Sequence, residues 1–376
     1  MMPRLSALLM AALVFPQLAV ADAPAAATPK PAESTDRFDR IWQLSRLTAS
    51  GEYPSIKLRG RYHGQQYWVD AGDDGRADDW EHRRFRLGMD IGFSDRFEFS
   101  FDLNLDRNGV GPLVDDFDYA AFQWQVDDAT RLQFGKLRRM PLTREDGTSS
   151  NNILTIERSL IAARFLLDNT GGVYVEHERG RWTVGGGVLS GSLDEDNLGL
   201  PTLDGGIALQ GNVAYQATPA TELRLDYVYN EGNPDNNAIA PFRHMVSLNS
   251  ASQWQRFGLI TDIIFADALP AARGDLFSVV LMPHYKLTPR LQAVARFTYA
   301  GSNAVDGVRL SSRYERRANQ LAGDRGDDYQ AWYAGLNYYF YGHRLKLMAG
   351  IEHTRMQRPV GDYEALTAAA SMRIYF

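Results

Sequence analysis

Basic side chains are concentrated in one long stretch between residues 136 and 169. It reads KLRRMPLTREDGTSSNNILTIERSLIAARFLLDN, and its basic residues outnumber the acidic Glu145, Asp146, Glu157 and Asp168. Guanidinium and ammonium groups around a narrow passage can replace part of the hydration of an anion, so the predicted chemistry is anion selection. The candidate anion-binding residues are Lys136, Arg138, Arg139, Arg144 and Arg158.

A second group of charges lies on predicted strands outside this stretch. Four basic residues fall on two adjacent strands and could form a basic wall, whereas acidic residues of a third strand could form an opposing wall. The alternative is that opposite charges pair across neighbouring strands, and such mixed walls favour a weakly selective pore. The basic candidates are Arg59, Arg61, Arg84 and Arg86, and the acidic candidates are Glu98, Asp102 and Asp106.

The sequence contains few signs of a catalytic site. The seven histidines are scattered singly, cysteine is absent, and neither G-x-S-x-G nor H-E-x-x-H occurs. We therefore expect no cofactor, no metal site and no enzyme. An outer-membrane barrel enzyme such as a phospholipase, using for example His63 or His353, stays open as an alternative, because strand-end residues can assemble a site that sequence does not reveal.

The elements that would carry these residues show a period of two. In RFEFSFDLNLD, residues 96–106, every odd position is apolar and every even position after Arg96 is polar. The same alternation recurs to the end of the chain and predicts strands with one apolar and one polar face. We count about sixteen such strands.

The predicted connections alternate between short turns, such as SDR at Ser94, and long ones, such as AGDDGRADD at Ala71. This alternation is typical of a transmembrane antiparallel β-barrel with short periplasmic turns and long outer loops. A soluble β-sandwich is the structural rival, but its strands are usually shorter. The fold class predicted is therefore an all-β transmembrane barrel, in which the stretch 136–169 is a candidate constriction loop folded inward.

Three segments are predicted along the chain. Residues 1–21 have a basic start, an apolar core and an A-x-A step, and we interpret them as a secretory signal peptide. Residues 22–54 form a periplasmic tether with a possible short helix near Phe38–Leu47, which could plug the pore or act as a periplasmic foot. Residues 55–376 form the barrel, and the final strand ends in Phe376.

One motif resembles a known family. The run LQFGKLRRMPLTREDGTSSNNILTIERS is similar to the phosphate-selective porin O/P family at Gly135, Pro141, Glu145, Glu157 and Arg158, among other positions. The resemblance implies a homotrimeric, sixteen-stranded channel that passes small anions such as phosphate through the outer membrane of a Gram-negative bacterium. Leu142 follows the proline where the family commonly has an aromatic residue, so strict phosphate specificity does not follow.

The partners expected are outer-membrane lipid and small anionic solutes. A net charge of -6 gives no basic footprint for nucleic acid. Three functions remain open at this stage: a passive diffusion channel with anion preference or weak selectivity, a barrel enzyme, and a plugged barrel whose loops bind an external partner.

Overall fold

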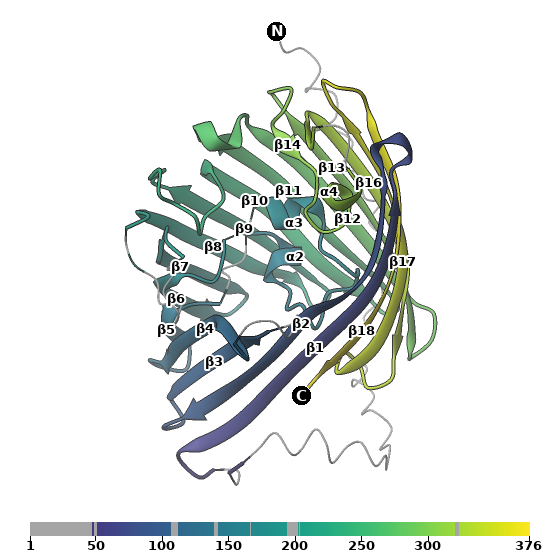
Figure 1. Ribbon diagram of the computed structural model, residues 1–376. Helices are drawn as coiled ribbons and strands as arrows, with labels where there is room; N and C mark the ends of the chain where they lie inside the picture. Colours follow the sequence, from purple (N-terminus) through teal and green to yellow (C-terminus); the bar gives the residue numbers. More distant parts are fainter. Residues whose placement is uncertain are drawn as a thin grey trace. The chain divides into compact units, whose positions relative to one another are not determined.

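A computed structural model describes residues 47–48, 51–106, 112–138, 142–165, 167–193, 202, 204–319 and 323–376. The predicted signal peptide, nearly all of the predicted tether and Arg139 lie outside these residues. Within the described ranges, sixteen antiparallel strands close into one barrel, which confirms the predicted fold class (Figure 1). Also among these residues, no helix is long and apolar enough to span a membrane.

The barrel strands follow one another around the ring in chain order, and the last strand, β18, pairs with the first. Their bounds are β1 Ser55–Asp70, β2 Arg76–Gly92, β3 Phe97–Leu105, β4 Val114–Gln125, β5 Thr130–Lys136, β6 Gly171–Arg179, β7 Trp182–Ser190, β8 Ile207–Thr218, β9 Thr221–Asn230, β10 Phe242–Trp254, β11 Phe257–Ala268, β12 Leu276–Lys286, β13 Leu291–Ser302, β16 Asp328–Tyr339, β17 Leu345–Gln357 and β18 Tyr363–Tyr375.

The remaining elements are short and lie in the connections. Helix α2 (Arg144–Gly147) and helix α3 (Leu160–Arg164) belong to the connection between β5 and β6. Helix α4 (Glu315–Ala318) and a two-stranded ribbon of β14 (Val308–Arg309) and β15 (Arg325–Gly326) belong to the connection between β13 and β16. Two 3-10 turns, η2 (Gly72–Asp74) and η3 (Pro270–Ala272), complete the described elements.

The strands bury their polar face and expose their apolar face, the reverse of a soluble domain. On β17, Lys346 is fully buried whereas Leu347 is 44% exposed; on β18, Arg373 is fully buried whereas Met372 is 38% exposed. An apolar exterior is stable only against lipid, and polar side chains can then satisfy one another inside. The apolar positions of the period-two pattern therefore face lipid, and the polar positions face the lumen.

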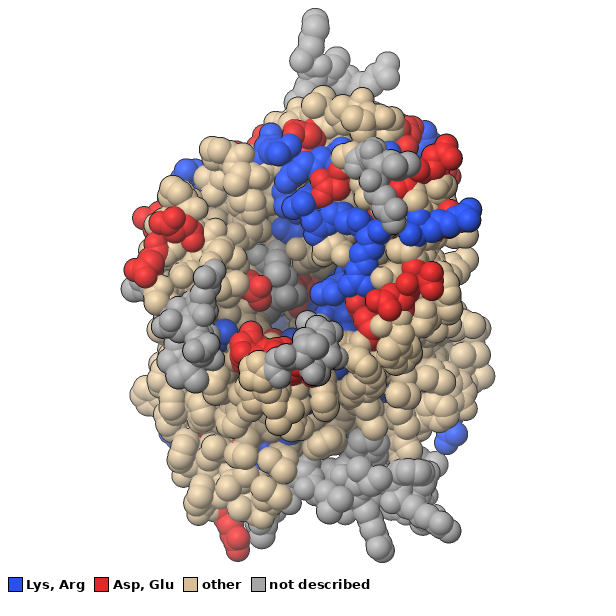
Figure 2. Space-filling model, viewed as in Figure 1, with Lys and Arg blue, Asp and Glu red and all other residues tan. Residues whose placement is uncertain are grey.

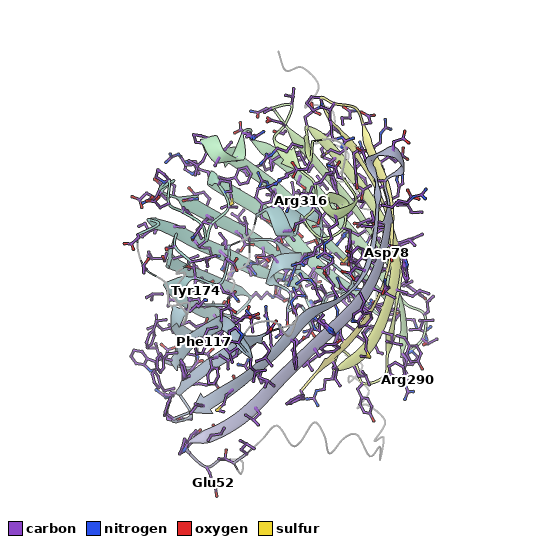
Figure 3. The ribbon with its side chains drawn as sticks, viewed as in Figure 1. Glu52, Asp78, Phe117, Tyr174, Arg290 and Arg316 are labelled. Carbon is purple, nitrogen blue, oxygen red and sulfur yellow. The ribbon has the colours of Figure 1, made fainter. Side chains whose placement is uncertain are left out.

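Connections at the two ends of the barrel differ in length. Turns such as residues 180–181 and 219–220 join strands at one end, which we call the short-turn end, and the connections at residues 137–170 and 303–327 leave from the long-loop end. In Figure 3, Arg290 of a short turn and Arg316 of a long connection lie toward opposite ends. One predicted long connection is in fact tight, because β2 begins at Arg76 and pairs with β1 as far as Asp70.

Aromatic rings gather on the outer surface near the short-turn end. Trp182 lies 4.4 Å from Tyr215, Trp254 lies 5.9 Å from Phe257, and Tyr338 lies 4.9 Å from Phe340, measured between ring centroids. Such rings are amphipathic and concentrate where the hydrocarbon of a bilayer meets its headgroups. They mark one edge of the lipid-facing band.

Candidate functional site: the inward-folded loop and the lumen wall

The connection between β5 and β6, residues 137–170, crosses the lumen of the barrel. It leaves from β5, yet its Glu145 meets Arg296 of β13, with 2.8 Å between Oε1 and Nη1. In the ring of sixteen strands, β5 and β13 are eight places apart in either direction, so they face each other. A segment attached to one of these strands reaches the lumen face of the other only across the interior.

Local hydrogen bonds make this crossing segment, which we call the lumen loop, compact. The Thr143 hydroxyl caps α2 by accepting from the Asp146 amide at 3.0 Å, and the Ser159 hydroxyl caps α3 by accepting from the Ala162 amide at 3.3 Å. Arg158 joins the two halves by donating to the carbonyl oxygens of Glu145 and Thr148. The local sequences T-x-x-D (residues 143–146) and E-R-S (residues 157–159) therefore supply the caps and the arginine that hold the loop in this shape.

The barrel wall holds the tip of the lumen loop mainly through the loop's carbonyl oxygens. Lys346 Nζ donates to Ile153 O at 2.8 Å, Asn337 Nδ2 to Leu154 O at 2.8 Å, and Arg373 Nη1 to Ser150 O at 2.6 Å. Arg373 also donates to the carbonyl of Ile156. A carbonyl satisfies the hydrogen bonds of a guanidinium without cancelling its charge, so Arg373 adds positive potential to the loop.

The carboxylate of Glu157 in the lumen loop is paired with an arginine of the barrel wall. Glu157 accepts from Arg83 Nε of β2 at 2.6 Å and from Gln65 Nε2 of β1 at 2.9 Å. Burial opposes the charge of Glu157, but the Arg83 guanidinium outweighs burial and holds the pKa of this carboxyl well below its usual range. Arg83 lies where the register of β1 and β2 shifts, at the bulge between His63 and Gly64, and its side chain reaches the lumen loop from there.

The predicted basic wall on β1 and β2 is interleaved with acids. Arg59 Nη2 lies 3.0 Å from Asp90 Oδ1 and 3.2 Å from Asp102 Oδ1, and Arg61 lies 3.9 Å from Asp102. Arg86 pairs with Asp118 of β4. Arg84 stands opposite His63 in the register, and the ring of His63 is hydrogen-bonded to Asn151 of the lumen loop.

The predicted acidic wall does not lie across the lumen from the basic residues of β1 and β2. Glu98 and Asp102 are on β3, which pairs directly with β2, and Asp106 follows the end of β3. Asp102 is only 4% exposed and takes part in the ion pairs just described. Asp102 pairs with Arg59 of β1, two strands away, so the acids of β3 lie beside the basic strands and not on the far side of the ring.

The predicted loop residues are spread over several settings. Lys136 is the last residue of β5 and is buried, whereas the guanidinium of the exposed Arg138 stacks 4.0 Å from the ring centroid of Tyr119 and donates to its hydroxyl. Arg144 donates its backbone amide to Asp262 and its Nη2 to Glu222, both at 2.6 Å. Arg139 lies outside the described residues.

A second inward segment was missed by the sequence analysis. In the connection between β13 and β16, Tyr314 accepts from Gln65 at 3.0 Å, and Arg317 donates to Tyr67 and Glu81. Only the basic run RYERRA distinguishes this segment in the sequence, and such a run is equally typical of a solvated loop. In Figure 2, basic side chains form a continuous band beside the central hollow, over the region of α4 in Figure 1.

The described part of the chain offers no group of three or more His, Cys, Asp or Glu that could hold a metal ion. The arrangement is a polar lumen, narrowed by a loop that is tied to the opposite wall through Arg296 and Arg373. It is suited to the passage of small hydrophilic solutes.

Fold and lumen together define an outer-membrane porin, located in the outer membrane of a Gram-negative bacterium. The chain belongs to the phosphate-selective porin O and P family, which it matches over residues 56–280. A relative in Caulobacter vibrioides, an uncharacterized protein, is 28% identical over 187 residues. That match covers 48% of this chain and only 36% of the relative.

Solved outer-membrane channels share the fold. The channel DcaP of Acinetobacter baumannii superposes with a TM-score of 0.57 at 11% identity, covering 86% of this chain and 97% of that one. OmpF of Salmonella typhi, solved with daunomycin, gives 0.56 at 13% identity over 86% and 98% of the two chains. OprB of Pseudomonas putida gives 0.56 at 12% identity over 85% and 94%. At these identities the likeness concerns the fold alone.

Proposed function

We propose that this porin is a passive diffusion channel for small hydrophilic solutes with a preference for anions such as phosphate. One observation carries the preference: Arg373, which fixes the lumen loop, is hydrogen-bonded to the backbone carbonyls of Ser150 and Ile156. Its charge is therefore not cancelled by a hydrogen-bonded acid. Positive potential at a narrowing attracts anions and raises their local concentration.

The preference should be moderate. Arg59 and Arg86 each lie in an ion pair, so they act as dipoles more than as free charges. A lumen lined by such pairs orients polar solutes across its width but contributes little net field along it. A weakly selective general porin is consequently the second candidate, and the ion pairs of β1 to β4 are the observation that favours it.

The proposal includes a homotrimer, as the family resemblance implies. OmpT of Vibrio cholerae, solved in a trimer form, superposes with a TM-score of 0.52 at 12% identity over 85% of this chain and 99% of that one. The lipid-facing surface described above would then divide between lipid and the neighbouring subunits.

Single-channel recording in a planar bilayer tests the proposal. Currents carried by chloride, phosphate and acetate are compared with those of potassium under the same conditions. We expect larger currents for the anions than for potassium. Equal currents would favour the general porin, and absence of conductance would contradict a diffusion channel of either kind.

A further inference from the structure

The ring of Tyr119 on β4 lies beneath two guanidinium groups. Cζ of Arg138 is 4.0 Å from the ring centroid, and Cζ of Arg59 is 5.4 Å from it. Tyr119 is 2% exposed and stands opposite the inward-facing Asp102 in the register of β3 and β4, so its ring belongs to the lumen wall. Cations are attracted to the face of such a ring. The wall therefore offers a fixed, flat support where the lumen loop begins.

The two arginines differ in their other partners. Arg59 lies 3.0 Å from Asp90 and 3.2 Å from Asp102, and it also donates to a backbone carbonyl. Arg138 donates to the hydroxyl of Tyr119 and, among the residues that the structure describes, forms no ion pair with a carboxylate. The charge of Arg59 is thus shared with two acids, whereas Arg138 keeps its charge for a solute.

The guanidinium of Arg138 is exposed and held in one orientation. Contact with the face of Tyr119 fixes its plane, and the bond from Nη2 to the Tyr119 hydroxyl fixes its rotation within that plane. A guanidinium has five N–H donors, so one bond to the hydroxyl leaves four. Two parallel N–H groups of this fork match the two oxygens of a carboxylate, whereas a spherical halide ion gains only the attraction of the charge.

We propose that Arg138 is a carboxylate-binding residue of the lumen, oriented by Tyr119, and that the porin retains carboxylate solutes longer than halide ions of the same charge. This inference rests on the proposed anion channel and names a class of solute that the channel recognises. Arg373 has a different part, because two of its N–H groups are engaged by loop carbonyls. It attracts anions of any shape, and Arg138 distinguishes among them.

The test compares potassium acetate with potassium chloride, which share the cation and differ in the shape of the anion. Single-channel conductance is measured as a function of the concentration of each salt, because an anion that binds in the lumen makes the conductance saturate. Half of the maximal conductance is expected at a concentration roughly fivefold lower for acetate than for chloride, since only acetate can engage the fork. Arg138→Lys keeps the charge but has neither the fork nor the flat face, and it should remove most of this difference.

Two further variants separate recognition from a general change of the pore. Tyr119→Phe keeps the ring and removes the hydroxyl that orients Arg138, so the difference between acetate and chloride should become smaller without vanishing. Arg309→Lys is the matched control, because Arg309 is on β14 in the connection between β13 and β16 and not on the lumen loop. This control should leave the difference between the two anions intact.

The two anions are compared within one variant, so a change that affects every solute equally cancels. Equal half-saturation by acetate and chloride in the unmodified protein would overturn the inference even in an anion-selective channel. An unchanged difference in Arg138→Lys would also overturn it. A reversal potential in KCl that shows preference for potassium would instead overturn the proposed function, and the comparison of acetate with chloride would still report on Arg138.

Discussion

Arg296 of β13 joins the lumen loop to the opposite wall through Glu145, with 2.8 Å between Nη1 and Oε1. Both side chains are 3% exposed, and Arg296 Nη2 lies 2.6 Å from Glu352 of β17. One guanidinium therefore connects the loop and two strands. A loop attached at its ends to β5 and β6 is in this way also fixed at its centre.

Removing Arg296 should release the loop. Arg296→Met removes the partner of the buried Glu145 and of the partly buried Glu352, and breaking a buried pair costs about 3–5 kcal/mol. Hydrogen–deuterium exchange of residues 142–165 should accelerate strongly. Arg355→Met is the control, because the Arg355–Asp362 pair is 54% and 52% exposed and contributes at most about 1 kcal/mol. Equal exchange in both variants would contradict the anchoring role.

The apolar core inside the lumen should matter as much as the charges. Phe165 of the loop is fully buried, 5.1 Å from the ring centroid of Phe242 on β10. Phe165→Ala should lower the free energy of unfolding by about 3–5 kcal/mol. Thermal unfolding of the solubilised protein measures this loss. Val360→Ala, at a position 65% exposed, should change the unfolding temperature little, and a similar change in both would place Phe165 outside the core.

The position of α4 should depend on pH through Glu315. Burial and the nearby carboxylate of Glu352 raise the pKa of Glu315 to about 7, although Tyr329, Thr354 and the Ser311 amide donate to it. A raised pKa means that the folded loop binds a proton that the unfolded loop releases. The contribution of Glu315 to the stability of the folded loop is therefore fully present below about pH 4.5. It is lost as the pH rises through about 7.

After division by the intrinsic, base-catalysed exchange rate at each pH, the protection of the amides of residues 311–319 should accordingly be greater at pH 5 than at pH 8. The difference in free energy has an upper limit of about 3 kcal/mol, the equivalent of the pKa shift. Glu315→Gln cannot ionise and should abolish the pH dependence of this protection. If the variant keeps it, another group controls this segment.

Charge removal at the lumen loop should reduce anion preference more than charge removal at the outer connection. Arg138→Gln combined with Arg144→Gln should lower the anion-to-cation permeability ratio roughly twofold or more, because a charge about 8 Å from an ion in water contributes about 0.5 kcal/mol. Arg309→Gln is the control, since Arg309 is on β14 in the connection between β13 and β16 and not on the lumen loop. Reversal potentials measure both, and equal effects would mean that the loop does not control selectivity.

The fold followed from the sequence because lipid imposes a period of two on every strand. The period-two runs predict about sixteen strands, and sixteen strands form the barrel among the described residues. The expected long connection at Ala71 was wrong, since polar residues such as Asp78 and Asp79 can continue a strand beyond the membrane, where no apolar face is needed. Figure 3 labels Asp78 on this extended part.

The site was less predictable because its contacts are long-range. The alternation of β3 indicated that Asp102 faces the lumen, but not that it pairs with Arg59 two strands away. Sequence also could not show that the wall residue Arg373 binds loop carbonyls, because carbonyl groups carry no side-chain signal. The pairing of charges is decided by which strands become neighbours, and by where the loop crosses.

The reversal potential of the unmodified protein in a KCl gradient across a planar bilayer tests the central claim most directly. Because Arg373 is bound by carbonyls of the lumen loop, we expect a reversal potential whose sign shows preferential movement of chloride. This potential should be moderate in size, and high salt should reduce it. A potential of the opposite sign, showing preferential potassium movement, would contradict the account.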